Sequence, residues 1–272
     1  MNGQPRQFVS TNDQERYAAD GVVCVRQAFN AEWISFLEQG FQRTLSRPSK
    51  WFSDHAPEEG RGRFITDLGM AHHDETFQRF VHESGAAEMV AALLNTVRLN
   101  FFFDTMWIKG AGVRKPTNWH QDLPYYTVDG DQMCVLWVAL DAMPSGVALE
   151  FVRGSHRWNR WFEPTRTTEG TSWYDKSPYE PVPDIDANRE DFDVISWSMQ
   201  PGDCVIFHGL MLHGARGNPL SYDRRAYSSV WLGDDVVWSE RPGYSRPRFD
   251  EAGLSPGDPI ESALFPRILP RL

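Results

Sequence analysis

The chain of 272 residues is 41% hydrophobic and 13% aromatic, and its formal net charge is −10. This acidic balance argues against nucleic acid and anionic membranes as partners, and it says little about a small-molecule substrate. The three cysteines form no CxxC pair, and no leader-like or membrane-length apolar run occurs, which predicts a cytoplasmic protein. We expect a single domain over 1–272 that acts as a monomer or a homodimer.

The first 96 residues are predicted to form a mainly helical buttress. Polar caps followed by apolar residues at intervals of three or four indicate helices at 11–19, 31–45, 74–83 and 86–94, with a short strand at 22–25 and a charged loop at 51–63. The second helix is expected to end before Pro48, because proline cannot continue it.

From residue 97 onward the pattern changes to strands, predicted at 99–108, 132–140, 147–152, 194–199, 203–207 and 225–232. The core, 97–239, is interrupted by a polar insert at 157–193, too long for an ordinary loop and interpreted as a lid or an active-site wall. A proline-rich tail, 240–272, is expected to close against the body. Helices followed by many strands predict a mainly β fold, a double-stranded β-helix (jelly roll) with an N-terminal helical buttress.

A possible metal motif lies at 118–126, Asn-Trp-His-Gln-Asp-Leu-Pro-Tyr-Tyr. If this segment is extended, His120 and Asp122 project from the same face, because side chains two apart in a strand do so. One imidazole and one carboxylate, completed by a second histidine, are the ligands of the facial triad that binds Fe(II).

Two other segments contain histidines that are candidates for the metal site. The triplet His72-His73-Asp74 has the same HxD spacing, but Asp74 followed by Glu75 indicates a helix N-cap. After the Pro-Gly-Asp turn at 201–203, an apolar strand leads to His208 and His213. We favour His213 as the third ligand, since the glycines after it allow close backbone approach, and assign His208 to a supporting or core position.

Arg224 lies eleven residues after His213, where the next strand begins. An arginine alone at a strand start is usually exposed. Beside a metal, its planar fork could bind the distal carboxylate of a chelating ligand in a bidentate manner, which lysine would not reproduce.

These residues resemble the phytanoyl-CoA dioxygenase family of Fe(II)/2-oxoglutarate oxygenases, which includes ectoine hydroxylase. The similarity runs from about 13 to 237 and depends on the ordered set His120-x-Asp122, His213-Gly214 and Arg224. It implies iron ligation by His120, Asp122 and His213, and binding of the 2-oxoglutarate C5 carboxylate by Arg224. Trp137 matches a family tryptophan beside the cosubstrate.

The sequence also departs from that family. Ala215 stands where many members have serine, which removes one hydroxyl contact to 2-oxoglutarate, and Trp107 stands where a polar contact is usual. We still place Trp107, with Trp137 and Arg224, among the residues that bind the cosubstrate.

The resemblance implies an enzyme that uses Fe(II), 2-oxoglutarate and O₂ to hydroxylate an unactivated C–H bond of a small molecule, with release of succinate and CO₂. Desaturation, epimerisation or ring closure would use the same ligands. A cupin-type metalloprotein without 2-oxoglutarate and a jelly-roll binding protein are the other possibilities. Tyr125, Tyr126 and Arg63 are candidates to line the substrate pocket.

Overall fold

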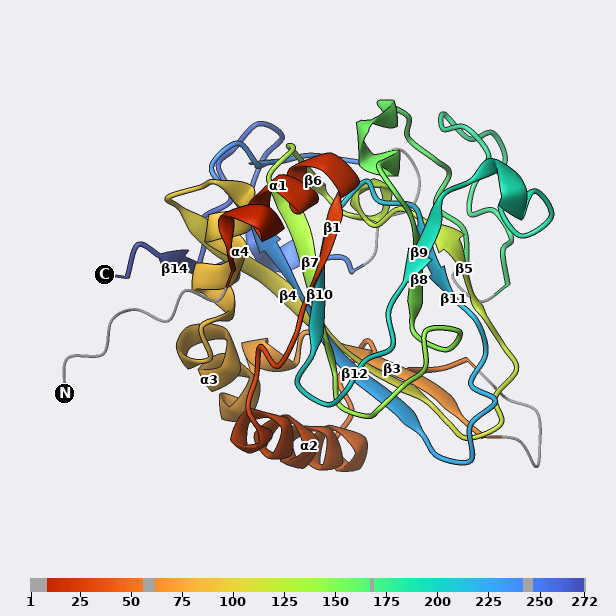
Figure 1. Ribbon diagram of the computed structural model, residues 1–272. Helices are drawn as coiled ribbons and strands as arrows, with labels where there is room; N and C mark the ends of the chain where they lie inside the picture. Colours follow the sequence, from red (N-terminus) through yellow and green to blue (C-terminus); the bar gives the residue numbers. More distant parts are fainter. Residues whose placement is uncertain (1–8, 56–61, 167–168, 242–246, 272) are drawn as a thin grey trace.

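Two antiparallel sheets form the body of the protein, and helices cover the outer face of the larger one (Figure 1). The computed structural model describes residues 9–55, 62–166, 169–241 and 247–271. The larger sheet contains, in spatial order, β1 (Val22–Val25), β10 (Cys204–His208), β7 (Met133–Ala139), β12 (Arg224–Leu232), β4 (Leu99–Lys109), β3 (Phe64–Leu68) and β2 (Ser53–Asp54), with β14 (Arg267–Leu269) beside β4.

The second sheet faces the inner side of the first. Its strands are, in order, β5 (Thr117–His120), β11 (His213–Ala215), β8 (Leu149–Val152) and β9 (Val194–Ser196). A separate pair joins β13 (Val237–Trp238) to β6 (Val128–Asp129). The two facing sheets make a mainly β, double-stranded β-helix core, as the sequence predicts.

Helices precede the core, and within the described residues five 3₁₀ turns lie between the strands. The helices are α1 (Thr11–Asp20), α2 (Ala31–Ser46), α3 (Glu75–Glu83) and α4 (Ala86–Leu94); the 3₁₀ turns are η1 (Met70–His72), η2 (Leu123–Tyr125), η3 (Ser155–Trp158), η4 (Arg189–Asp191) and η5 (Asp250–Ala252). Local sequence explains the ends of α1: Ser10 and Asp13 form a capping box, and Gly21 stops the helix in the left-handed region at φ 80°.

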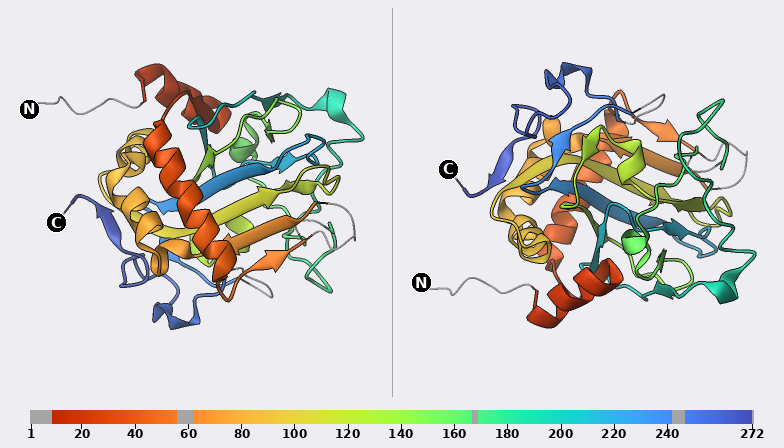
Figure 2. Two further views of the ribbon diagram at one scale, coloured as in Figure 1. Left: turned by 90° about the horizontal axis from the view of Figure 1, so that it is seen from below. Right: turned by 90° about the horizontal axis from the view of Figure 1, so that it is seen from above.

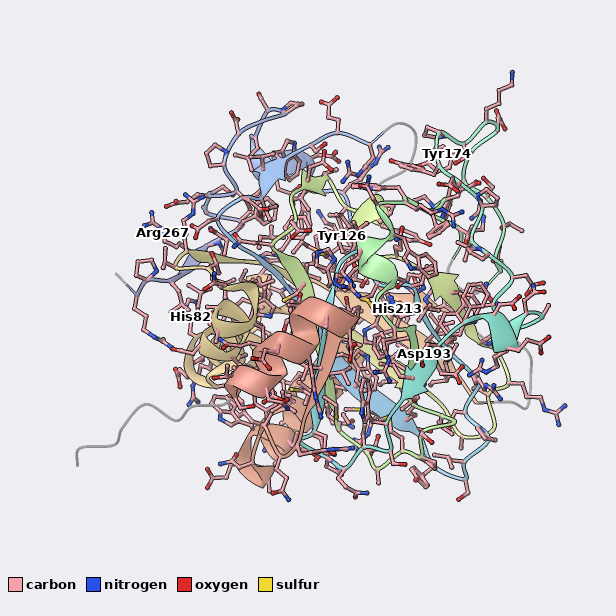
Figure 3. All side chains as sticks on the ribbon, turned by 45° about the horizontal axis from the view of Figure 1, so that its top comes forward. His82, Tyr126, Tyr174, Asp193, His213 and Arg267 are labelled. Carbon is pink, nitrogen blue, oxygen red and sulfur yellow. The ribbon has the colours of Figure 1, made fainter. Side chains whose placement is uncertain are left out.

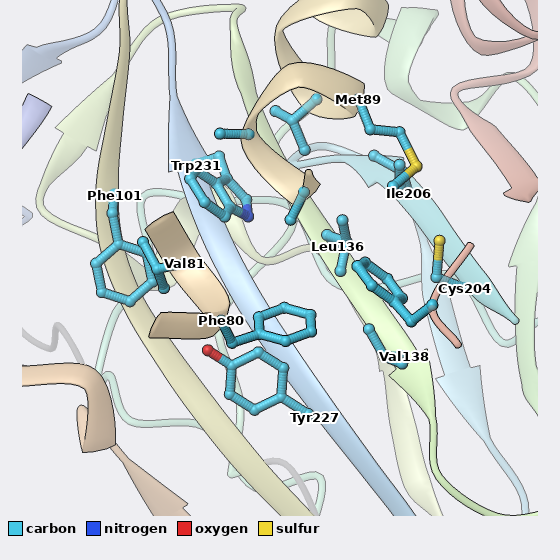
Figure 4. Close-up of a cluster of buried hydrophobic side chains, with 14 of the residues drawn as sticks. Phe80, Val81, Met89, Phe101, Leu136, Val138, Cys204, Ile206, Tyr227 and Trp231 are labelled. Carbon is cyan, nitrogen blue, oxygen red and sulfur yellow. The ribbon is translucent and has the colours of Figure 1, made fainter. Parts of the chain in front are cut away.

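The helices bury one face against the large sheet. α2 crosses its outer surface (Figure 2), and α3 and α4 pack beside it over β12 and β7 (Figure 4). The Phe80 ring of α3 lies 5.0 Å from that of Tyr227 in an edge-on arrangement. This apolar layer fixes one side of the sheet, so the other side, facing β5, β11 and β8, is left to build a site.

The predicted helices and long strands are confirmed, with differences at a few short segments. β3 lies at the end of the predicted charged loop and was missed, because Asp67 interrupts its apolar pattern; the Asp67 carboxylate is buried and accepts a hydrogen bond from the Ser49 amide at 2.8 Å. β11, of three residues, was also missed, and β5, of four residues, covers only the first part of the segment considered as extended at 118–126. The central part of the predicted loop, 56–61, lies outside the described residues.

The described part of the tail contacts the body of the protein. Leu269 pairs with Leu99 of β4, and the rings of Phe249 and Phe265 are buried against Phe102. In the part of the chain that the structure describes, no helix has both the length and the apolar character needed to span a membrane.

Candidate metal centre

His120, Asp122 and His213 meet at the inner surface of the smaller sheet. His120 ends β5 directly opposite His213, which begins β11, and the two imidazole centroids are 4.2 Å apart. The Asp122 carboxylate lies 3.5 Å from His120 Nε2 and 3.8 Å from His213 Nε2. All three groups offer a ligand atom within 4.8 Å of the others, a spacing that can hold one metal ion.

Asp122 reaches this cluster by a different route from the one the sequence suggested. The extended strand ends at His120, and Asp122 has helical angles, φ −84° and ψ −44°, at the start of η2. Its amide and that of Leu123 donate to the carbonyl of Gly209 at 3.0 and 2.9 Å. The segment therefore turns after His120, and the carboxylate comes back toward both imidazoles. The condition that the segment is extended holds only as far as His120, and the turn after it brings the three side chains together.

Both imidazoles are oriented by their own backbone neighbourhood. His120 Nδ1 lies 2.7 Å from the Asn118 carbonyl, and His213 Nδ1 lies 3.0 Å from that of Met211. A carbonyl only accepts, so each Nδ1 carries the proton and each Nε2 lone pair points toward Asp122. This is the tautomer in which Nε2 can bind a metal.

The protonation states also suit a metal. Burial, and then the neighbouring His120, lower the pKa of His213 to about 4, so its imidazole is neutral near pH 7. Burial raises the pKa of Asp122, but His213, His120 and Tyr126 outweigh it and hold that pKa below its usual value. The site thus presents neutral nitrogen and anionic oxygen, the forms that ligate Fe(II).

Arg224 lies in the interior and has no acidic partner among the described residues. Only 4% of it is exposed, its Nη1 donates to the Val147 carbonyl at 2.5 Å, and its buried Nε has no hydrogen-bond partner. Burial lowers its pKa to about 10, which leaves it protonated at neutral pH. A buried, unpaired guanidinium is unfavourable unless it meets an anion, so this position fits the carboxylate of a bound ligand.

Lys109 is a second basic residue at this place, and sequence reasoning missed it. It lies directly opposite Arg224 in the β4–β12 register and is 1% exposed. Its Nζ donates to the Thr117 hydroxyl at 3.3 Å and the Arg216 carbonyl at 3.1 Å. Strand alternation could have found it, because Lys109 follows Trp107 by two residues and therefore shares its face.

The register also shows what stands near Ala215, the position where a serine hydroxyl was expected. Thr117 on β5 is the direct partner of Ala215, and its hydroxyl is the one that Lys109 approaches. Beyond them, the Asn218 amide donates to the carbonyls of Lys109 and Tyr222, both at 2.8 Å. A threonine hydroxyl on β5, that of Thr117, therefore stands beside the position where Ala215 lacks one.

Gly217 allows the close backbone approach that is expected after His213. A Cβ there would lie 2.6 Å from the carbonyl oxygens of Val113 and Arg114, so only glycine fits. His208 lies outside the metal cluster, buried, with Nε2 3.2 Å from Asp131. In the other HxD triplet, His72-His73-Asp74, Asp74 is the N-cap of α3, as expected: its side chain accepts a hydrogen bond from the Thr76 amide at 2.8 Å.

The two predicted tryptophans have different environments. The Trp137 ring lies 5.8 Å from the Arg224 guanidinium, so it is a wall of the arginine site. Trp107 donates from Nε1 to the Ser228 hydroxyl at 2.8 Å and faces an adjoining pocket. The indole is thus held rigidly between the arginine site and that pocket.

This pocket opens over the metal cluster and encloses about 970 Å³ of space, counting its mouth. His120, Asp122, Tyr125 and Tyr126 are among the residues that line it. Figure 3 shows Tyr126 and His213 in the body of the molecule, with Tyr174 of the insert at the outer edge. Arg63 is not brought into the pocket lining; its Nε pairs with Asp54 at 2.7 Å.

The insert 157–193 forms one wall of this pocket through Thr165, Arg166, Glu169 and Trp173. Two side chains of the metal motif hold the insert in place. The buried Gln121 amide accepts from the Phe162 amide at 2.9 Å and donates to the carbonyls of Arg160 and Leu210 at 3.1 and 2.9 Å. The Tyr125 hydroxyl donates to the Thr165 carbonyl at 2.6 Å and accepts from its amide at 2.9 Å.

Solved structures with the same fold include several oxygenases of low sequence similarity. The carbocyclase SnoK from nogalamycin biosynthesis superposes with a TM-score of 0.76 at 19% identity, over 97% of this chain and 99% of that one. The epimerase SnoN of the same biosynthesis gives 0.71 at 19% identity, over 96% of both chains. EctD from S. alaskensis gives 0.69 at 17% identity, over 90% of this chain and 85% of that one.

Among curated proteins, a probable phytanoyl-CoA dioxygenase of Caenorhabditis elegans is 29% identical over 119 residues, or 43% of this chain. The match spans 36% of that relative's length. The family model described as phytanoyl-CoA dioxygenase (PhyH) matches residues 17–226, a segment that holds the metal cluster, Lys109 and Arg224. This chain therefore belongs to the phytanoyl-CoA dioxygenase (PhyH) family.

Proposed function

We propose that this protein is a non-haem Fe(II)- and 2-oxoglutarate-dependent oxygenase that hydroxylates an unactivated C–H bond of a small molecule, with release of succinate and CO₂. The observation that carries the proposal is the pairing of two sites. One is a cluster of two imidazoles and a carboxylate; the other is a buried arginine with no acidic partner in the described chain. A metal-chelating 2-oxo acid with a distal carboxylate satisfies both at once.

In this proposal His120, Asp122 and His213 hold Fe(II). The bound metal with 2-oxoglutarate and O₂ supplies the oxidising chemistry, for which the protein has no side chain of its own. The two imidazoles keep their Nε2 lone pairs available because backbone carbonyls hold the Nδ1 protons. Asp122 contributes the charge that favours a divalent cation and is kept ionised by its neighbours.

We assign Arg224 to the C5 carboxylate of 2-oxoglutarate, with Lys109 as a second basic partner. Both are buried and lie opposite each other, and no carboxylate pairs with either in the described segments. Trp137 and Trp107 would enclose the carbon chain, the former beside the guanidinium and the latter fixed by Ser228. The apolar rings exclude water, which strengthens the charge-assisted hydrogen bonds.

Other oxidative outcomes at the same centre form the second candidate. SnoK and SnoN are described as α-ketoglutarate-dependent carbocyclase and epimerase, and their fold extends over nearly the whole of this chain. Ring closure or epimerisation would use the same ligands and differ in how the substrate is held. A cupin-type protein without 2-oxoglutarate has less support, because it leaves the buried Arg224 without a role.

We further propose that 1–272 work as one catalytic domain, with 1–96 as buttress, 97–239 as core and 240–272 as closing tail. Tyr125 and Tyr126 are proposed as substrate-pocket residues because they line the pocket above the cluster. The same proposal is not extended to Arg63, which pairs with Asp54 instead.

The test is anaerobic titration of the protein with Fe(II) and then 2-oxoglutarate, followed by succinate release after O₂ is admitted. We expect Asp122→Ala to abolish Fe(II) binding, and Arg224→Ala to keep Fe(II) binding but lose 2-oxoglutarate affinity. Asp74→Ala, which alters the other HxD triplet, is the matched control and should bind both normally. If Arg224→Ala releases succinate with an unchanged dependence on 2-oxoglutarate concentration, the proposal is wrong.

A further inference from the structure

The pocket over the metal cluster has walls made largely of aromatic rings in fixed positions. Phe64 and Trp107, on adjacent strands, stand 6.5 Å apart at 37°. On another side the rings of Phe103 and Tyr126 meet edge-on at 5.1 Å and 88°. Buried aromatic faces that are already ordered favour a rigid, ring-bearing ligand, since neither partner loses much conformational freedom on binding.

The charged groups of the described lining, apart from His120 and Asp122, satisfy each other. Arg166 and Glu169 stand on the same turn of the insert, with 3.7 Å between Nε and Oε2. The Arg166 guanidinium also lies 3.8 Å over the Trp173 ring. Within the described lining there is no lysine, and no arginine other than Arg166. Phosphates and carboxylates are normally bound by several such cations, so this wall offers little to an anionic ligand.

Apart from the charged groups and the imidazoles, the polar side chains of the described lining include three threonine hydroxyls among the rings. Thr66 and Thr105 project from the β3 and β4 walls, and Thr165 stands on the insert. The Thr66 hydroxyl lies 2.9 Å from His55 Nε2, on the pocket lining. Neutral donors and acceptors placed between aromatic faces match a molecule that carries hydroxyl or carbonyl groups on an otherwise apolar frame.

We propose that the substrate of this site is an uncharged, ring-containing small molecule bearing hydroxyl or carbonyl groups, and not an acyl-CoA thioester, a phosphate ester or an amino acid. The proposal rests on the proposed function, because it places the substrate above the same metal cluster. It narrows that function in one respect: in the described lining Arg166 is the only arginine or lysine and pairs with Glu169, so little is offered to the phosphates of the acyl-CoA that the family's name suggests.

The experiment uses the anaerobic protein loaded with Fe(II) and 2-oxoglutarate and compares two naphthalene probes that differ in one substituent with two further charged probes. These are 2,6-dihydroxynaphthalene, 6-hydroxy-2-naphthoate, the zwitterion tryptophan and octanoyl-CoA, with affinity measured by calorimetry. We expect the dihydroxy compound to bind at least tenfold more tightly than the carboxylate, and tryptophan and octanoyl-CoA to bind more weakly still. A loaded protein that binds no neutral probe, or prefers any charged one, overturns the proposal.

A variant that adds a charge tests whether the lining sets this preference. Thr165→Lys puts an ammonium at the half-buried insert wall and should tighten binding of 6-hydroxy-2-naphthoate at least tenfold. Thr171→Lys adds the same charge to the same insert at an exposed position outside the lining and should leave the preference unchanged. If the wild type, Thr165→Lys and Thr171→Lys all bind 6-hydroxy-2-naphthoate with the same affinity, the inference is contradicted. Failure to form the Fe(II) and 2-oxoglutarate complex would instead count against the proposed function.

Discussion

Lys109 and Arg224 lie directly opposite each other on β4 and β12, and neither has a carboxylate partner in the described chain. Burial and then the charge of Arg224 lower the pKa of Lys109 well below its ordinary value. Two adjacent basic groups in the interior oppose each other until an anion arrives. The relationship supports the carboxylate site that we propose at this corner of the fold, which would be unfavourable when empty.

Lys109→Met is expected to separate binding from stability. Loss of one charge-assisted hydrogen bond should weaken 2-oxoglutarate affinity by about 10- to 100-fold, on the basis of roughly 1.5–3 kcal/mol for such a bond. The free energy of unfolding should stay equal or rise, because methionine has a similar length and leaves no buried charge. Calorimetric titration and urea unfolding measure the two quantities.

The exposed Lys176→Met serves as control and should change neither quantity. A purely structural role for Lys109 predicts the opposite pattern, with lower stability and normal cosubstrate affinity. Because an anion favours the charged form of Lys109, the wild-type protein should also take up protons on binding 2-oxoglutarate, and the variant should take up fewer.

Arg224→Lys keeps the charge but should not keep the function. The guanidinium donates to the Val147 carbonyl at 2.5 Å and lies over Trp137, so its remaining nitrogens are held in one plane. An ammonium has no such fork, and we expect 2-oxoglutarate affinity to fall by about tenfold or more, while Fe(II) affinity is preserved. Titration of the two ligands in turn measures both. Wild-type cosubstrate affinity in the lysine variant would show that charge alone is recognised.

The three residues proposed as metal ligands could be singled out from the sequence because their chemistry is unusual. His120, Asp122 and His213 are a rare residue combination in order, and the Asp74 decoy could be set aside from local helix-capping rules. The turn that brings Asp122 back to the imidazoles could not be predicted, because it depends on the Gly209 carbonyl of a distant segment.

Lys109 was overlooked for a related reason. Lysine is almost always exposed, and only the strand register, which places it opposite Arg224, shows that its side chain points inward. Similarly, the insert was predicted as a lid or wall from its length alone. The residues that hold it, Gln121 and Tyr125, are not distinguished in sequence from ordinary neighbours of a metal motif.

Gln121→Leu is expected to release the insert from the metal motif. The Phe162 amide and the carbonyls of Arg160 and Leu210 would lose their partner, at about 1–3 kcal/mol for each group left unsatisfied. We expect faster proteolysis within 157–193 and weaker Fe(II) binding, since Gln121 stands between two ligands and also holds the segment before His213. Timed proteolysis and metal titration test this. The exposed Gln200→Leu is the control, and an equally protected insert in both variants would contradict the role assigned to Gln121.

Asp104 makes stability depend on pH, independently of the metal site. This fully buried carboxyl accepts hydrogen bonds from the Ala71 amide at 3.1 Å and the Tyr227 hydroxyl at 3.1 Å. Burial outweighs these bonds and raises its pKa to about 7. Between its unfolded pKa of about 4 and the folded value, the folded state holds a proton that the unfolded state has lost. Stability therefore falls as pH rises through this window, by about 1.4 kcal/mol per pH unit.

Asp104→Asn should remove this contribution, because the amide keeps the shape of the protonated acid and does not titrate. Urea unfolding of both proteins at intervals from pH 4 to pH 8 measures the difference in unfolding free energy. We expect that difference to shift in favour of the variant up to about pH 7 and then to level off. Taking the difference between the two proteins cancels the contributions of all other titrating groups, because both proteins share them. Asp250→Asn, at an exposed site, should follow the wild-type curve throughout. If the curves of Asp104→Asn and the wild type run parallel across this range, Asp104 is already ionised in the fold and the assigned pKa is wrong.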